Sequence, residues 1–192
     1  MMGKFFENLH RVLLAGLVLA ILVAIWRHSE YLTTSGYLAH LFRWIHVWFG
    51  ILWIGLLYYF NFVQIPSMPK IPDEQKPAIG KVIAPTALFF FRWAAAGTVL
   101  FGLLTAGANQ YIVEALTFQS GYTTIGTGMW LALIMAANVW FVIWPNQKKA
   151  LGIVQADPDA KKLAARTAMI ASRVNTMLSI PMLYCMVLQK LG

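Results

Sequence analysis

The four histidines are the side chains of this 192-residue chain whose chemistry best suits binding of a haem iron. His46 falls inside a long apolar stretch, whereas the other three lie outside such stretches: His10, His28 and His40. A haem b held by two histidines needs both rings to face one space, and His40 and His46 project about 240° apart around one helix. The candidate haem ligands are therefore His28 and His46. Hydrogen bonding by His46 without a cofactor is the alternative.

Five further polar residues fall within apolar stretches: Asn61, Arg92, Asn138, Arg173 and Asn175. An arginine at the bilayer centre costs about 2.5–3.5 kcal/mol even on a lenient insertion scale, so such residues need partners or a place near the membrane surface. Hydroxyl side chains also recur at i, i+4 and i+7 along one helical face: Ser172, Thr176 and Ser179. These polar groups either join helices together or form a cluster that binds an anion, a lipid head group or a partner's carboxylate.

Acidic residues and cysteine exclude several kinds of chemistry. All seven acids lie in predicted loops: Glu7, Glu30, Asp73, Glu74, Glu114, Asp157 and Asp159. Proton pumps and cation-coupled transporters usually bury carboxylates along their pathway, so these classes are disfavoured. Cys185 is the only cysteine, which excludes an internal disulfide and a CxxCH haem-attachment motif in this sequence. We expect no metal site, and no catalytic residue is identified.

Five apolar stretches predict the elements that position these residues. Hydrophobic residues make up 59% of the chain and charged residues 11%, against about 25% charged in soluble domains. Because a helix needs roughly 20 apolar residues to cross a bilayer, we predict one all-α transmembrane domain over residues 1–192. Its helices are expected at about 12–26, 42–65, 88–107, 126–144 and 168–188, with the second and fourth ended by Pro66 and Pro145. Asp157 and Pro158 form a helix-start signature for the fifth.

The basic residues predict how the helices are oriented. Ten lysines and arginines fall at the N-terminus and in the second and fourth connections, and three fall on the opposite side. The positive-inside rule then places the N-terminus in the cytoplasm and the C-terminus outside, in a multi-pass protein of the bacterial inner membrane. This pattern accounts for the net charge of +8, so lipid is an expected partner and nucleic acid is not.

Small residues recur every four positions on three of the predicted helices, for example at Gly16, Ala20 and Ala24. Such ridges let helix backbones approach closely within a membrane. They predict either packing inside one bundle or, for the first helix, contact with another protein subunit.

Three segments resemble the membrane domain of bacterial urate oxidases, the type that couples a multi-helix membrane domain to a c-type cytochrome. These segments are Arg43–Phe62, Phe91–Ala95 and Ala171–Leu183, and the similarity runs over about residues 38–189. The resemblance implies that His46, Arg92, Arg173 and Asn175 are positions to test. The chain has about five predicted helices where that family has more, and it lacks the haem-attachment motif.

Three functions remain open at this point. The chain is either a non-catalytic accessory subunit of a larger membrane redox complex, a haem b-binding protein of electron transport that uses His46, or a membrane component of a urate-oxidising enzyme. The last of these would work with a separate cytochrome c.

Overall fold

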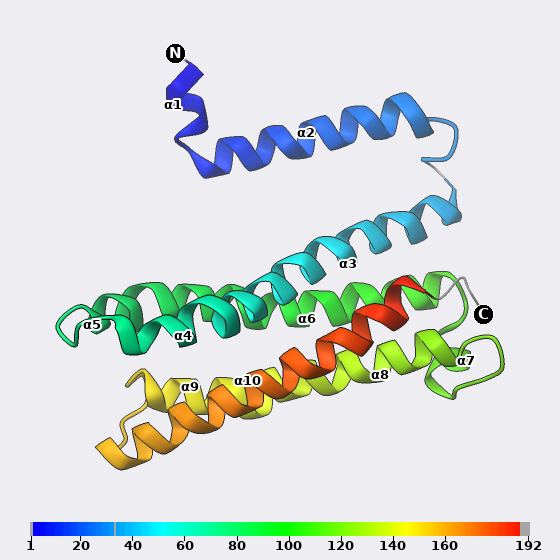
Figure 1. Cartoon of the computed structure of the whole chain (residues 1–192). Helices are drawn as coiled ribbons and strands as arrows, with labels where there is room; N and C mark the ends of the chain where they lie inside the picture. The colour runs from blue at the N-terminus through cyan, green and yellow to red at the C-terminus, as the bar shows by residue number, and fades with distance from the viewer. Residues whose placement is uncertain (1, 33, 189–192) are drawn as a thin grey trace.

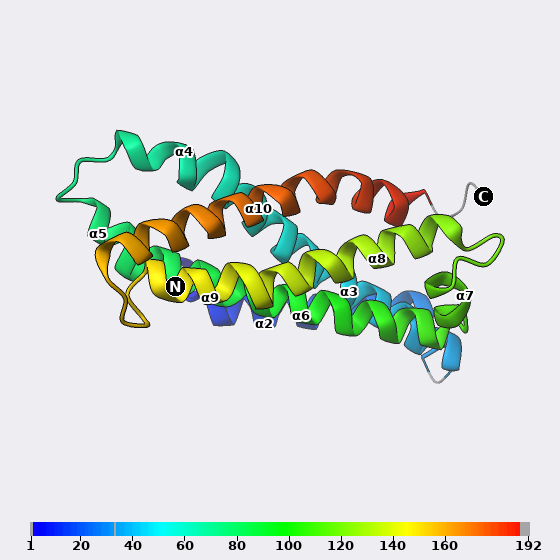
Figure 2. The same ribbon diagram turned by 90° about the horizontal axis from the view of Figure 1, so that it is seen from below.

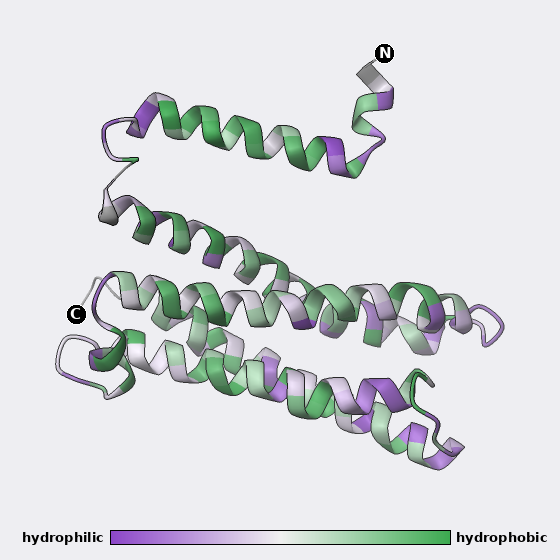
Figure 3. Cartoon of the chain, turned by 180° about the vertical axis from the view of Figure 1, so that it is seen from behind, coloured by the Kyte–Doolittle hydropathy of each residue, from purple (hydrophilic) through white to green (hydrophobic). Residues whose placement is uncertain are grey.

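The computed structural model describes residues 2–32 and 34–188, and these are helical throughout, with turns between the helices (Figure 1). Five helices are long and apolar enough to cross a membrane, as the sequence predicts: Leu9–His28, Gly36–Lys70, Lys76–Ala108, Thr123–Ala150 and Pro158–Val187. Apolar residues fill their middle portions and polar residues gather towards their ends (Figure 3). Each of the five helices is longer than its predicted apolar stretch, because the helical backbone continues into the polar segments at its ends.

The helical elements are, in chain order, α1 (Met2–Phe6), α2 (Leu9–His28), α3 (Ser35–Tyr58), α4 (Ile65–Ser67), α5 (Lys76–Ala78), α6 (Ala84–Ala108), α7 (Ile112–Leu116), α8 (Thr123–Asn138), α9 (Trp144–Ala150) and α10 (Pro158–Val187). A 3₁₀ turn over Met68–Lys70 follows α4. Asp157 caps α10, as its sequence signature predicts, since its side-chain oxygen accepts a hydrogen bond from the Ala160 amide at 2.7 Å.

Prolines lie within the long helices, so the prediction that Pro66 and Pro145 end the second and fourth helices is wrong. A π-helical segment ends two residues before each of three prolines: Tyr59–Gln64 before Pro66, Ile79–Ile83 before Pro85, and Val139–Ile143 before Pro145. Proline lacks an amide hydrogen, and its ring clashes with the carbonyl four residues earlier. A π turn shifts the hydrogen bonding to i→i+5, which accommodates that carbonyl and lets the helix continue.

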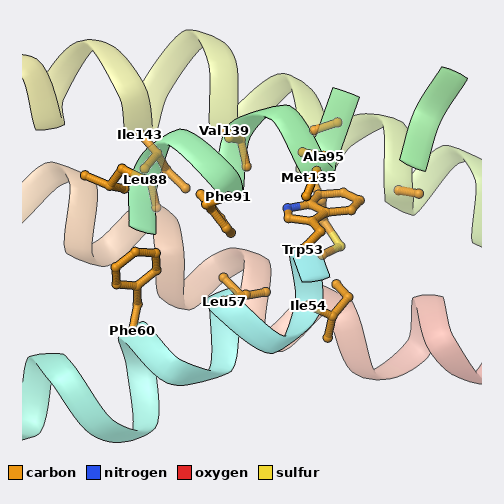
Figure 4. Close-up of a cluster of buried hydrophobic side chains, with 14 of the residues drawn as sticks. Trp53, Ile54, Leu57, Phe60, Leu88, Phe91, Ala95, Met135, Val139 and Ile143 are labelled. Atoms are coloured by element: carbon orange, nitrogen blue, oxygen red, sulfur yellow. The ribbon is translucent and has the colours of Figure 1, made fainter. Parts of the chain in front are cut away.

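Four of the long helices form the bundle, with α3 packed along α6 and α8 packed along α10 (Figures 1 and 2). The main hydrophobic core lies where these pairs meet (Figure 4). Its largest fully buried side chains include Trp53 and Leu57 from α3, Phe91 from α6 and Met135 from α8. The core is continuous through the middle of the bundle, so these four helices act as one packed unit.

The remaining long helix, α2, stands apart from the bundle (Figure 1). None of its residues is buried, although its sequence is almost entirely apolar between Arg11 and Arg27. Leucine and valine side chains point outward all around it. A helix that is apolar on every side needs lipid or another protein as its surroundings.

Different connecting segments lie at the two ends of the bundle. At one end, called here the α7 end, lie the α2–α3 connection, α7 and the last turn of α10. At the other, called the α5 end, lie α5 and the connection between α9 and α10.

Candidate functional site

A cavity of about 530 Å³ opens between the four helices in the half of the bundle nearest α7. Its walls come from Arg43–Gly55 of α3, Thr98–Thr105 of α6, Ile125–Leu133 of α8 and Met182–Val187 of α10, with Tyr111 at the α7 end. Most of the lining is aliphatic, aromatic or thioether, with few polar groups. Both the volume and this composition fall in the range of small-molecule and cofactor sites, which is about 300–1,000 Å³.

His46 is the one histidine that lines this cavity among the residues that the structure describes. Its Nδ1 lies 2.8 Å from the carbonyl oxygen of Thr98 on α6. A carbonyl oxygen only accepts hydrogen bonds, so Nδ1 carries the proton and donates. In the neutral ring, the lone pair is therefore on Nε2, which has no hydrogen-bond partner within the described chain. The contact fixes both the orientation and the tautomer that a metal-binding histidine requires.

Gly102 makes room for this ring one helical turn after Thr98. A Cβ atom at Gly102 would lie 3.0 Å from both Cε1 and Nδ1 of His46. Contacts this short are tighter than ordinary van der Waals contacts, so any larger residue would displace the imidazole. The absence of a side chain at Gly102 is thus part of what positions His46.

Three methionines, Met129, Met182 and Met186, share the cavity with His46. Their thioethers are soft, polarizable groups that fill irregular space and also serve as iron ligands opposite a histidine. Sequence reasoning missed them, because methionine is common throughout apolar helices. The i, i+4 spacing of Met182 and Met186 places them on one face of α10, but nothing in the sequence indicates that Met129 of α8 faces the same space.

The α7 end of the cavity is its polar end. Arg43 lines the cavity there and is exposed, and Tyr111 lies close to it. Burial raises the pKa of Tyr111, and the positive charge of Arg43 opposes part of that rise. Tyr111 therefore remains a neutral phenol that donates a hydrogen bond, beside a permanent cation. Together they suit an anionic or hydrogen-bond-accepting group at this end of a bound molecule.

His28, the other haem ligand expected from the sequence, does not lie in the cavity. It ends α2, is exposed, and has its ring centroid 6.4 Å from that of Tyr37. The structure therefore does not bring His28 and His46 together within this chain. His40 is exposed as well, and it lies outside the lining.

A network of hydrogen bonds joins the helices on the far side of the cavity from α7. Asn138 of α8 donates to Asn175 Oδ1 of α10 at 2.7 Å and to the Ala171 carbonyl at 2.9 Å. Asn175 in turn donates to the Met135 carbonyl of α8 at 3.0 Å, and its side chain is fully buried. These reciprocal bonds fasten α8 to α10.

A second set of hydrogen bonds joins α10 to the end of α3 and to the segment after it. Asn61 donates to the Ser172 hydroxyl at 2.8 Å, and the hydroxyls of Tyr58 and Ser179 are 2.9 Å apart. The side-chain oxygens of Asn61 and Gln64 are buried without a partner in the described structure. The polar residues here hold the bundle together, and their arrangement shows no acid–base pair.

The two arginines of the predicted polar cluster lie apart from the asparagines. Arg173 is exposed, on a face of α10 different from that of Asn175. Arg92 is half-buried, with its guanidinium carbon 3.9 Å from the ring centroid of Trp144. The structure thus bonds Asn138 to Asn175 and, separately, Asn61 to Ser172 of the same helix α10, and it leaves both arginines outside these contacts.

In the described part of the chain, no group of three or more histidine, cysteine, aspartate or glutamate side chains is placed to hold a metal ion. A family model described as urate oxidase N-terminal matches residues 92–191, slightly more than half of the chain. This match confirms the family resemblance seen in the sequence; it includes Ala171–Leu183 but not Arg43–Phe62. No curated protein and no solved structure matches the chain.

Proposed function

The chain belongs to the urate oxidase N-terminal family, and we propose that it is a membrane subunit that holds haem b on His46 and passes electrons within a larger redox assembly. The observation that carries this proposal is the setting of His46. Its Nδ1 is held by the Thr98 carbonyl, and the ring lines an apolar cavity between four helices. The free lone pair on Nε2 is the group that ligates iron in haem proteins.

The residues of the cavity fit a haem group in several respects. His46 would hold the iron, and Met129, Met182 or Met186 offers a thioether as a second ligand. Gly50 and Gly55 leave the wall of α3 free of side chains at two positions, which suits a flat ring. When bound, haem b supplies a one-electron carrier.

The remaining residues would tune and orient such a group. Thr98 keeps the His46 ring in one tautomer through its carbonyl oxygen. Arg43 provides a cation for a carboxylate at the α7 end, and Tyr111 provides a neutral hydrogen-bond donor there. The rest of the cavity wall is largely apolar.

An absorption spectrum tests this proposal directly. Protein purified in mild detergent from haem-replete cells should show a Soret band, and His46→Ala should abolish it. His40→Ala is the matched control, because it removes an exposed histidine from the same helix and should retain the spectrum. Gly102→Ala should weaken or shift the band by displacing the imidazole. A colourless wild-type protein would refute haem binding.

The name of the family supports a place in urate oxidation for the assembly. In our proposal, electrons from urate pass through this chain to a c-type cytochrome. Membranes that contain the protein should consume urate when a cytochrome or an artificial acceptor is added, and His46→Ala should slow that consumption. If His46→Ala consumed urate as fast as the wild type, the cavity around His46 would have no part in urate oxidation.

We further propose the orientation given by the basic residues, with the α7 end and the cavity towards the outer face of a bacterial inner membrane. A single cysteine introduced by Gln75→Cys or by Gln155→Cys, each with Cys185→Ala, tests it in intact cells. Reaction of either loop with a membrane-impermeant thiol reagent would reverse the assignment. Both loops should react only after the cells are opened.

A non-catalytic accessory role is the second candidate function, and α2 favours it. All residues of α2 are at least partly exposed, and the small residues Gly16, Ala20 and Ala24 lie in a row along it. A partner subunit that packs on this row would make the chain co-migrate with a larger assembly in mild detergent. Ala20→Leu should disrupt that co-migration, and Leu19→Ala should not. A purified chain that is stable and active by itself would rule this role out.

A further inference from the structure

Two cations lie over one indole ring where α6 meets α9. The guanidinium carbon of Arg92 is 3.9 Å from the ring centroid of Trp144, and the Lys148 ammonium is 5.7 Å from the same centroid. Arg92 makes two further contacts within its own helix: its guanidinium carbon is 5.4 Å from the ring centroid of Phe89, and its Nη1 donates a long 3.5 Å hydrogen bond to the carbonyl oxygen of Leu88. Most of the hydrogen-bonding capacity of its guanidinium therefore stays unused.

The positive charge at this place has no counter-ion within the described residues. The ion pairs formed in residues 2–32 and 34–188 are Lys76–Asp73 and Lys162–Asp159, and neither involves Arg92 or Lys148. Two like charges held at one ring repel each other. A bound anion would remove that repulsion and would take up the free N–H groups of the guanidinium.

Two large apolar side chains of α6 flank Arg92 and are exposed. Phe89 and Trp93 are 46% and 52% exposed, and the Phe89 ring centroid is 5.4 Å from the guanidinium carbon. Lys81, the preceding basic residue, lies about 16 Å back along the same helical axis at 1.5 Å per residue. Arg92 therefore sits within the apolar part of α6, where aromatic side chains meet acyl chains, and not in the polar segment at the α5 end.

We propose that Arg92, Trp144 and Lys148 bind the phosphate group of an anionic phospholipid in the membrane leaflet at the α5 end. A guanidinium and an ammonium are the usual partners of lipid phosphates in basic pockets between membrane helices. The exposed aromatic side chains would contact the acyl chains of the same lipid, which a soluble phosphate lacks. This site is separate from the His46 cavity and does not depend on haem binding.

The test compares binding of two lipids by wild-type protein and matched variants. The full chain is reconstituted in nanodiscs of phosphatidylcholine, with or without phosphatidylglycerol, and bound lipid is counted by native mass spectrometry after transfer to detergent. Arg92→Gln and Lys148→Gln each remove one cation. Lys149→Gln is the control, because it removes a neighbouring exposed charge that does not lie over Trp144.

We expect the wild type and Lys149→Gln to retain phosphatidylglycerol in preference to phosphatidylcholine. Each of the other two variants should bind it about fivefold more weakly, which corresponds to one basic residue near an anionic lipid. Millimolar inorganic phosphate should not displace the lipid. Thermal unfolding in pure phosphatidylcholine checks that Arg92→Gln still folds. If this variant does not fold, the comparison of lipid binding by Lys148→Gln and Lys149→Gln tests the proposal by itself.

Four results would overturn the proposal. The first is equal lipid retention in wild type and Lys148→Gln. The second is an equal loss in Lys149→Gln, which would indicate attraction to the general positive surface. The third is displacement of the lipid by inorganic phosphate. The fourth is Arg92-dependent capture of a partner protein without any bound lipid.

Discussion

Replacing Gly97 by alanine would place a methyl group against the ring of Phe49, where α6 and α3 pack together. The new Cβ would lie 2.7 Å from Cγ and Cδ1 and 2.8 Å from Cε1 of that ring. Ordinary contacts begin at 3.4 Å, so the nearest ring atoms must retreat by about 0.7 Å to reach that distance. Because Cγ is attached directly to Cβ, rotation of the ring alone does not relieve the clash. The ring of Phe49 also stacks on that of Phe101, with 5.7 Å between ring centroids, and this contact limits how far Phe49 can move.

The energetic consequence has two parts of opposite sign. Overpacking of this kind costs about 1–3 kcal/mol. Alanine also favours a helix over glycine by about 0.8–1.0 kcal/mol, so the net destabilisation expected for Gly97→Ala is about 0–2 kcal/mol. Gly107→Ala is the matched control, because it lies in the same helix and its Cβ would meet no atom within 4 Å. It should be neutral or slightly stabilising.

The assay is equilibrium unfolding in mixed micelles by added SDS, followed by circular dichroism. Gly97→Ala should unfold at a lower SDS fraction than Gly107→Ala, by a difference of about 1–3 kcal/mol. Gly97 precedes Thr98, whose carbonyl holds His46, so the same variant should also weaken any haem spectrum. If Gly97→Ala were as stable as Gly107→Ala, α3 and α6 would not approach as described, and the positioning of His46 would lose its basis.

Two further perturbations test other contacts of the bundle. A double-mutant cycle of Asn138→Ala and Asn175→Ala should give a coupling free energy of about 0.6 kcal/mol, and at most about 1.7 kcal/mol. These are the values of other hydrogen bonds between membrane helices. Strictly additive effects of the two substitutions on stability would contradict the reciprocal bonds. Gly126→Ala should destabilise the protein more than Gly97→Ala, because its Cβ would collide with the main-chain carbonyl of Ala115 in α7. Equal unfolding midpoints for these two glycine variants would mean that α7 does not rest on α8.

The number and type of the membrane-length helices could be predicted from the sequence, because backbone groups in an apolar stretch must bond within their own helix. The ends of the helices could not. Proline is a reliable end signal only if the helix keeps its α-type hydrogen bonds. In this chain a π turn before Pro66 makes room for the carbonyl that the proline ring would otherwise contact, so the helix continues to Lys70. No local sequence rule distinguishes a proline that ends a helix from one that follows a π turn.

Part of the polar network could be predicted from helical spacing. Ser172 and Ser179 are both buried, and Thr176 is half-buried between them, as the i, i+4, i+7 spacing indicates. The same geometry separates Arg173 from Asn175, since residues two apart on a helix project about 200° from each other. Helical spacing alone therefore separates Arg173 from Asn175. The pairing of Asn175 with Asn138 was not predictable, because it depends on how α8 and α10 are rotated against each other.

The contents of the cavity depend on packing between helices that are distant in the sequence. His46 could be predicted as a candidate ligand, because a histidine is rare in an apolar helix. The methionines beside it could not, because methionine is common in such helices and their place in the cavity depends on the rotation of α8 and α10. The partner expected for His46 was His28, but the helix that carries His28 does not pack against the bundle.

The distribution of the interhelical hydrogen bonds explains why the cavity lies where it does. Hydrogen bonds join α8 to α10 through Asn138 and Asn175, and they join α10 to the end of α3 and the segment after it through Tyr58 and Asn61. All of these residues lie beyond the cavity towards the α5 end. Around the cavity itself, the described side chains join α3 to α6 through His46, and no corresponding bond joins that pair to α8 or α10. The two helix pairs are therefore joined by side-chain hydrogen bonds in one half and by apolar contacts in the other, where Ala106 of α6 packs with Ile125 and Met129 of α8. A ligand in the cavity would add contacts between the pairs, so its binding and the stability of the α7 half of the bundle should be linked.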